Sequence, residues 1–148
     1  MKTFLVPIDF SAVSGEVVDA AAGFARAFEG KVILLHTIMS PIVTSEYALP
    51  ASAVQEMMAA NEKAAETKLA RYLETCRKAG LEATALVRQG PPVSEILNEA
   101  VKSGADFIVM GSHGHGKLYD LLVGSTASGV LKGARCGVII MPHQSKKG

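Results

Sequence analysis

Four glycines are concentrated between Met110 and Thr126, in the segment MGSHGHGKLYDLLVGST, which ends with the hydroxyl side chains of Ser125 and Thr126. The segment follows an apolar run, residues 106–110, that is typical of a buried parallel strand. A helix is expected to start at its end, with Ser125 and Thr126 as candidate N-caps. Glycine lets another molecule approach the main chain closely, and the first amides of a helix attract anions. A nucleotide is therefore the first ligand to consider.

Two familiar phosphate-binding motifs do not fit this segment. Gly111 to Lys117 has the spacing of a P-loop, but Leu118 stands where a hydroxyl would hold magnesium, and the expected helix starts later. A dinucleotide fingerprint would continue Gly114-His115-Gly116 to a third glycine, where this chain has Tyr119. Both motifs are rejected on these grounds.

Strand-like and helix-like patterns alternate along the chain. We expect strands at residues 4–8, 32–35, 83–87, 106–110 and 138–141 and helices starting near residues 14, 51, 92 and 125. Phe28, Met57 and Val101 fall at helical spacing on the faces expected to point inward. We expect a loop from Ile38 to Pro50 and a frayed tail at residues 143–148.

This alternation predicts a single α/β domain over residues 1–148, with an open five-stranded parallel sheet covered by helices on both faces. Right-handed crossovers favour the strand order 3-2-1-4-5. The order then reverses between strands one and four, where ligands bind at the carboxyl ends. Residues 7–11 and 111–125 follow those two ends, so topology and motif indicate the same cleft.

The composition excludes several classes of protein. A formal net charge of +1 argues against a nucleic-acid binder, and five Phe, three Tyr and no Trp argue against a base-stacking platform. No apolar run is long enough to span a bilayer, and the apolar start is interrupted by Asp9 too early for a signal peptide. Cys76 and Cys136 are expected to be reduced thiols of a cytoplasmic protein.

The spacing Gly111-x-x-Gly114, nine residues, then Gly124-Ser125 resembles the nucleotide motif of the universal stress protein family. Further similarity lies in Val6-Pro7-Ile8-Asp9 with Ser11, residues 32–36, Gly90, Ile96 and residues 106–114, so it extends over nearly the whole chain. The resemblance implies a Rossmann-like domain of the adenine nucleotide alpha hydrolase type, usually a dimer. The glycines place it in the ATP-binding branch of that family.

The resemblance also implies roles for individual residues. Gly111 and Gly114 would form the turn at the ribose and phosphates, and Gly124, Ser125 and Thr126 would meet the distal phosphates. Asp9 and Pro7 would face the adenosine, and Asp9 could orient a water or a metal. The full set implied for the nucleotide site is Pro7, Asp9, Ser11, Thr37, Met110, Gly111, His113, Gly114, Gly124, Ser125 and Thr126.

In this set Thr37 matches a position, often valine, that touches the adenine, and Met110 would pack near the base or sugar. Asp9 could instead cap the turn that follows it, and Lys117 could steer phosphate or be a solvated side chain. His113 and His115 have no third metal ligand nearby in sequence, so no resident metal is predicted there. His36 is expected to be packed or hydrogen-bonded.

Three functions remain open at the level of sequence. The first is an ATP-dependent switch or sensor, with ATP, ADP or AMP as the ligand, with or without Mg²⁺. The second is a slow Mg²⁺-dependent ATPase, although a base and an arginine finger are not evident. The third is a homodimeric interaction module with a vestigial nucleotide site. Its interface would be the last strand, Val138, Ile139, Ile140 and Met141, an apolar sheet edge.

Overall fold

Five parallel strands form one sheet in the computed structural model, which describes residues 1–39, 49–113 and 123–142. The strands are β1 (Thr3–Pro7), β2 (Lys31–Ile38), β3 (Ala83–Gln89), β4 (Phe107–Gly111) and β5 (Gly137–Met141). Their order is β3-β2-β1-β4-β5, which confirms the predicted topology. β2 and β3 are each longer than the sequence pattern predicted, because they pair with one another as far as Ile38 and Gln89.

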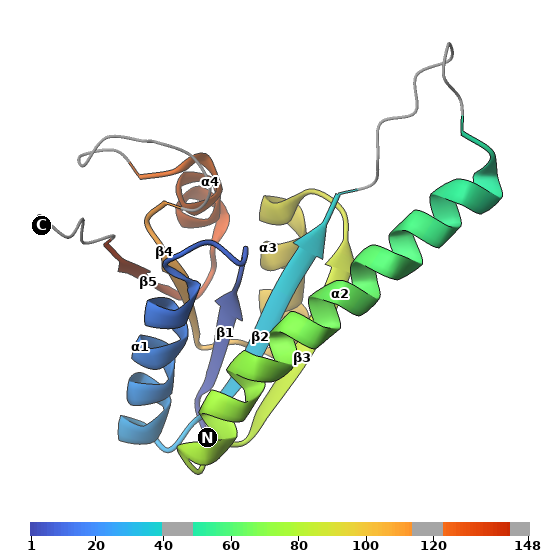
Figure 1. The fold of residues 1–148 in the computed structure, drawn as a ribbon. Coiled ribbons are helices and arrows are strands. Elements are labelled where there is room, and N and C mark those ends of the chain that lie inside the picture. Colours follow the sequence, from blue (N-terminus) through green and yellow to red (C-terminus); the bar gives the residue numbers. More distant parts are fainter. Residues whose placement is uncertain (40–48, 114–122, 143–148) are drawn as a thin grey trace, which may run out of the picture.

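Helices cover both faces of this sheet (Figure 1). They are α1 (Ser14–Ala27), α2 (Ala51–Lys78), α3 (Pro92–Ser103) and α4 (Ser125–Gly133). α1 and α2 pack on one face and bury Val17, Val18, Leu69 and Cys76 against it. α3 and α4 pack on the other face, where they bury the four residues Ile96, Ala100, Ala127 and Val130.

The central strand β1 contributes to both cores. Phe4 and Val6 are buried on the α1 and α2 side, and Leu5 is buried on the α3 and α4 side, each with 0% of its surface exposed. Side chains alternate across a strand, so a strand buried on both faces must be apolar at every position. This requirement explains the uninterrupted apolar character of the first strand.

Three side chains expected to point inward lie at the surface instead. Phe28, Met57 and Val101 are 55%, 44% and 69% exposed. Phe28 is the C-cap of α1, and in α2 it is Met58, the neighbour of Met57, that packs against Ile38 and Val87 of the sheet. Val101 lies in the last turn of α3, beyond the core contact of Ala100. A helical period therefore does not decide which of two neighbouring apolar residues, such as Met57 and Met58, faces the sheet.

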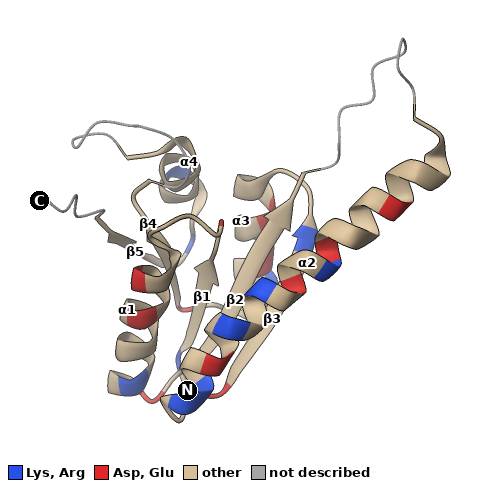
Figure 2. Ribbon diagram, in the orientation of Figure 1, with Lys and Arg blue, Asp and Glu red and all other residues tan. Residues whose placement is uncertain are grey.

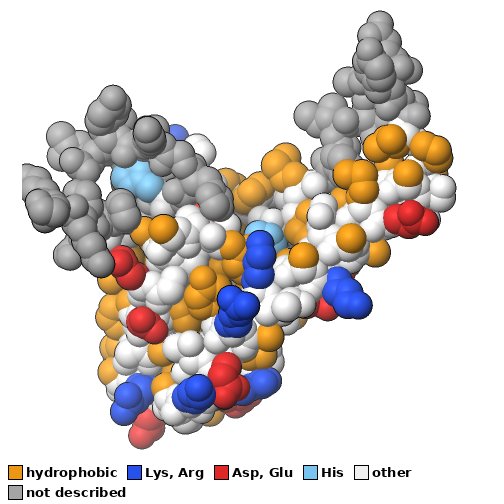
Figure 3. Space-filling model, viewed as in Figure 1, with side chains coloured by type: hydrophobic (Ala, Val, Ile, Leu, Met, Phe, Trp, Pro, Cys, Tyr) orange, Lys and Arg blue, Asp and Glu red, His pale blue; other side chains and the backbone are white. Residues whose placement is uncertain are grey.

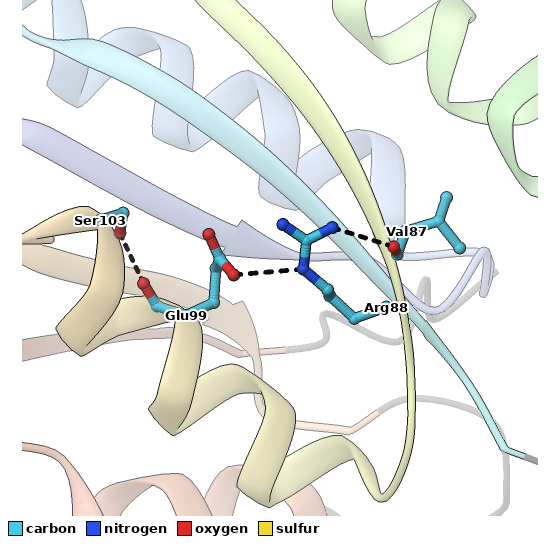
Figure 4. A network of polar contacts seen from close by, with 4 residues as sticks. All are labelled: Val87, Arg88, Glu99 and Ser103. Atoms are coloured by element: carbon cyan, nitrogen blue, oxygen red, sulfur yellow. Dashed lines mark hydrogen bonds and ion pairs between the residues drawn. The ribbon is translucent and has the colours of Figure 1, made fainter.

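One ion pair fixes α3 to the edge strand β3. Arg88 Nε of β3 donates to Glu99 Oε2 of α3 at 3.4 Å, and Arg88 Nη1 donates to the Val87 carbonyl at 3.3 Å (Figure 4). Ser103 Oγ donates to the Glu99 carbonyl one helical turn later. The Glu99 side chain is only 9% exposed, so this contact orients the helix that forms one wall of the site described below.

Among the described residues, Asp9 and Arg88 lie at or near the carboxyl ends of their strands, and most other charged residues lie elsewhere. Figure 2 shows Lys, Arg, Asp and Glu mixed along α2 and gathered at the opposite end, around the N-terminus. A bilayer-spanning helix would need a long and nearly uncharged apolar run, and the helices of the described ranges contain none.

Candidate functional site

A cavity of about 410 Å³ opens at the carboxyl ends of β1, β2 and β4. Figure 3 shows the molecule hollowed at this edge, between the α4 side and the projecting end of α2. This is the point at which the strand order reverses, where open parallel sheets place their ligands. The volume lies within the range of small-molecule pockets.

Most residues that the sequence assigned to a nucleotide site line this cavity. They are Pro7, Asp9, Thr37, Met110, Gly111, His113, Gly124, Ser125 and Thr126. Ser11 does not line it; its buried hydroxyl has no hydrogen-bond partner among the described residues. Gly114 lies outside the described residues. The segments that meet here are far apart in the chain, as the switch-point argument requires.

The wall of the cavity also includes residues that sequence reasoning missed. Ser14, Pro92, Ile96 and Ser112 line it as well. Ser112 lies inside the glycine-rich segment, and Pro92 is the first residue of the helix that follows β3. Their positions just after strand ends could have indicated that they line the cavity. Ile96 belongs both to the core and to the cavity lining, and an isoleucine in the sequence is equally compatible with either position.

Thr37 presents main-chain groups to the cavity. Pro7 pairs with Leu35, and the last hydrogen bond between β1 and β2 runs from the Ile8 N–H to the Leu35 carbonyl at 2.8 Å. Residues two apart on a strand direct their main-chain groups to the same side, so the N–H and C=O of Thr37 also point toward β1. β1 has ended there, and no described residue accepts from or donates to them. A donor and an acceptor therefore lie side by side at the wall.

Asp9 stabilises the turn that leaves β1. Its Oδ1 accepts the Ser11 N–H at 2.9 Å and the Ser14 hydroxyl at 3.3 Å. Phe10, between Asp9 and Ser11, has φ = 61°, a left-handed backbone conformation that residues other than glycine rarely adopt. The turn-capping interpretation of Asp9 is thus confirmed. The side chain is also exposed at the rim of the cavity, so a ligand can approach it.

The start of α4 forms the opposite wall. Its N-cap is Gly124, one residue before the Ser125 expected from sequence, and the Gly124 carbonyl accepts the Ser128 N–H at 2.9 Å. Among the described residues, no side-chain cap hydrogen bond is made at this end. The N–H groups of the first helical turn have no acceptor within the helix, and Ser125, Thr126 and Ala127, which carry them, all line the cavity. An anion would be favoured at this wall.

Gly124 is held close to the end of β4. Its N–H donates to the Ser112 carbonyl at 2.7 Å, and a Cβ built on it would come within 3.1 Å of the same oxygen. The Ser112 N–H in turn donates to the Met141 carbonyl at 2.9 Å. The amide of Gly124 is therefore already used by the chain, whereas no described residue accepts from the amides of Ser125, Thr126 and Ala127. Glycine at this position is explained by packing as well as by ligand access.

Two histidines line the cavity. His113 Nδ1 lies 3.0 Å from the Ser112 hydroxyl, and its buried Nε2 has no hydrogen-bond partner in the described part of the chain. His36 Nδ1 lies 2.7 Å from the Ile8 carbonyl, which confirms that this residue is hydrogen-bonded. Asp9 is the one Asp, Glu, Lys or Arg among the described lining residues. Within the same residues, no group of three or more His, Cys, Asp or Glu could hold a metal ion.

The sequence matches the model of the universal stress protein family over residues 1–142. The chain belongs to the universal stress protein family. A family relative, universal stress protein MJ0531 of Methanocaldococcus jannaschii, is 30% identical over 148 residues, which cover 99% of this chain and 85% of the relative. Universal stress protein YxiE of Bacillus subtilis is 29% identical over 142 residues, or 93% and 96% of the two chains.

Solved structures of the family share the fold. The structure of hypothetical protein MJ0577 of M. jannaschii superposes with a TM-score of 0.86 at 26% identity and covers 98% of both chains. A universal stress protein in complex with cAMP has a TM-score of 0.71 at 21% identity, covering 95% and 96% of the chains. One from Archaeoglobus fulgidus in complex with dAMP has a TM-score of 0.65 at 22% identity, covering 95% and 97%.

Proposed function

We propose that this protein binds ATP in the cavity at the switch point and acts as a nucleotide-dependent switch or sensor. One observation carries the proposal: the cavity joins a main-chain donor and acceptor at Thr37 to the uncapped start of α4. Adenine carries an acceptor (N1) beside a donor (N6), which is complementary to an N–H beside a C=O. The family relatives solved with cAMP and dAMP support an adenine nucleotide as the ligand class.

In this arrangement the base lies near Pro7 and Thr37, and Met110 packs against the base or sugar. The ribose and first phosphate pass Gly111 and His113, and the distal phosphates meet Ser125 and Thr126 at the start of α4. Gly114 belongs to the same proposed set by its place in the motif, although it lies outside the described residues. Ser11 acts indirectly, because its N–H fixes the Asp9 carboxylate.

Binding is placed ahead of hydrolysis because phosphoryl transfer requires neutralisation of the developing charge and an oriented nucleophile. The described lining residues offer helix amides and hydroxyls, but their one Asp, Glu, Lys or Arg is the carboxylate of Asp9. Such a set holds a triphosphate better than it cleaves one. ATP with Mg²⁺ as its companion ion, bound in the cytoplasm, is the form that we propose the protein senses.

The amide at the first position of α4 allows a sharp test. Ser125→Pro removes this N–H together with the hydroxyl, yet proline is well tolerated at the first helical residue. The preceding Gly124 has φ = −59° and ψ = 161°, which a following proline accepts. Ser125→Ala is the matched control, since it removes the hydroxyl alone.

Calorimetry with ATP, ADP, AMP and GTP should show tightest binding for ATP in the wild type. Ser125→Pro should weaken ATP at least tenfold and bring it close to AMP, while Ser125→Ala should lose about threefold, the share of a neutral hydrogen bond. Circular dichroism would verify that both variants fold. No binding of any adenine nucleotide at millimolar concentration would refute the proposal.

We also propose that the protein forms a homodimer through β5. This strand is the edge of the sheet, and its residues Val138, Ile139, Ile140 and Met141 are each only partly buried. An apolar edge strand invites pairing with an identical strand across a two-fold axis. Sedimentation should show a dimer, and Val138→Lys, which places a charge on the edge, should shift it toward monomer. A monomer at 100-fold the concentration used for calorimetry would contradict this interface.

A further inference from the structure

The hydrogen bonds between β1 and β2 stop at Ile8 and Leu35, although β2 itself continues to Ile38. In a parallel ladder the bond after Ile8 N–H to Leu35 C=O joins the Thr37 N–H to the Ile8 carbonyl. That bond is not made. The Ile8 carbonyl instead accepts from His36 Nδ1 at 2.7 Å. The His36 side chain thus binds the carbonyl oxygen that the N–H of the next residue, Thr37, would bind in a continued ladder.

This contact fixes the state of the imidazole ring. A carbonyl oxygen can only accept, so Nδ1 carries the proton, and in the neutral ring Nε2 is the bare nitrogen. The ring itself lines the cavity. His36 is therefore held in one orientation at the boundary between the sheet and the ligand space.

Phe10 secures the arrangement from the other side. Its ring centroid lies 4.3 Å from that of His36 and 6.5 Å from that of Tyr72 on α2, and Lys68 Nζ lies 5.1 Å from the Phe10 ring centroid. With φ = 61°, Phe10 is not extended, so the strand does not continue through it. Such conformations are strained and persist where the surroundings determine them, often at ligand sites.

We propose that His36 is a positioning residue of the nucleotide site. By occupying the Ile8 carbonyl, and with Phe10 packed against its ring, it keeps the main-chain N–H and C=O of Thr37 unpaired for the edge of a purine base. The role in ligand binding rests on the proposed function. The structural part of the proposal, that the ring prevents one more ladder bond, can be tested without any ligand.

Amide hydrogen exchange measured by NMR without nucleotide tests the structural part. The Thr37 amide should exchange at least 100-fold faster than the Ile33 amide, because Ile33 lies inside the β1–β2 ladder. His36→Leu, similar in size but without a donor, should slow Thr37 exchange at least tenfold as the N–H turns to the Ile8 carbonyl. His36→Asn should keep fast exchange, since its side-chain nitrogen occupies the place of Nδ1.

A Thr37 amide that is already protected in the wild type, or that is unchanged in His36→Leu, would overturn the proposal. Nitrogen shifts of the His36 ring provide a measurement that requires no substitution: Nδ1 should be protonated and Nε2 bare. The opposite tautomer would also overturn it. Both measurements on the wild type remain decisive if His36→Leu does not fold.

Calorimetry tests the role in binding, with inorganic tripolyphosphate as the probe for the phosphate wall. His36→Leu should weaken ATP at least tenfold and leave tripolyphosphate within twofold, whereas His36→Asn should stay within threefold of wild type for both. Equal losses for ATP and tripolyphosphate would show general damage and overturn the assignment. If the wild type binds no adenine nucleotide, the proposed function fails, while the exchange experiment still decides what His36 does to Thr37.

Discussion

Gly129 of α4 lies directly against Val93 of α3. A Cβ built on Gly129 would come within 2.8 Å of Val93 Cγ2 and 3.1 Å of Cγ1. Helix axes approach this closely only where one surface lacks a side chain, so this glycine sets the distance between the two helices that enclose the cavity. Its low helix propensity is offset by the contact it permits.

Gly129→Ala should therefore destabilise the protein despite the better helix propensity of alanine. Valine is branched at Cβ and cannot swing aside, so we expect a loss of about 1–3 kcal/mol in the free energy of unfolding from overpacking. The shift of α4 should also weaken ATP. Urea denaturation and calorimetry would measure the two effects.

Gly133→Ala is the matched control on the same helix. Its Cβ would approach Leu97 Cδ1 at 2.5 Å, but this atom is the far end of a flexible side chain, and the next contact lies at 3.6 Å. We expect a change within about 0.5 kcal/mol. If the two substitutions had equal effects, the close packing at Val93 would not be what positions α4.

The ion pair between Arg88 and Glu99 gives a second prediction for stability. Glu99 is 9% exposed and Arg88 is 35% exposed, so removing the carboxylate leaves a cation that water reaches in part. Glu99→Ala should cost about 1–3 kcal/mol, below the loss expected for a fully buried pair. Glu74→Ala breaks the exposed pair with Lys78, whose atoms lie 4.0 Å apart, and should cost less than about 0.5 kcal/mol. A smaller loss at Glu99 than at Glu74 would contradict this account of α3.

Burial, and secondarily the charge of Asp19, raises the pKa of the Cys76 thiol above its ordinary value. A raised pKa in the folded state means that the unfolded chain releases this proton first as the pH rises. The contribution of Cys76 to stability is thus fully present below the ordinary thiol pKa, about 8.5, and is lost above it. Between pH 7.5 and 9.5 the free energy of unfolding should fall more steeply in the wild type than in Cys76→Ala. Parallel slopes would rule out this linkage.

Strand order, the helices and about half of the described cavity wall, nine of its nineteen residues, could be predicted because they depend on patterns that the sequence carries directly. The apolar run of β1 and the alternation of elements specify a doubly covered parallel sheet, and its switch point locates the cavity. The exposure of Met57 could not be predicted, since it depends on the exact rotation of α2, which turns the neighbouring Met58 toward Ile38 and Val87. The end of α1 is a similar case.

Gly30 follows α1, where a glycine in the left-handed conformation commonly ends a helix, yet it is Glu29 that adopts a positive φ, of 50°. Gly30 is required for another reason: a Cβ there would lie 2.6 Å from the Lys2 carbonyl oxygen. A glycine in the sequence indicates a constraint without saying which one it is. The main-chain N–H and C=O of Thr37 at the cavity could not be predicted either. Their position depends on the strand register and on the contact of His36 with the Ile8 carbonyl.

Asp9 offers a test that separates its two suggested roles. Its Oδ1 accepts both hydrogen bonds of the turn, and an asparagine oxygen can accept them too. Asp9→Asn should leave the free energy of unfolding within about 0.5 kcal/mol, whereas Asp9→Ala should lose about 1 kcal/mol, as for other caps of this kind. Thermal unfolding would measure this pair.

The same pair reports on the ligand. Without Mg²⁺, a carboxylate at the rim repels a polyphosphate, so Asp9→Asn should bind ATP slightly more tightly than the wild type, by about two- to threefold for a screened charge. With Mg²⁺ the order should reverse if the carboxylate and the ATP oxygens share the ion, because only the wild type then gains from the metal. Calorimetry in EDTA and in Mg²⁺ measures both. If Mg²⁺ raised the ATP affinity of Asp9→Asn as much as that of the wild type, Asp9 would stabilise the turn and take no part in binding the ion.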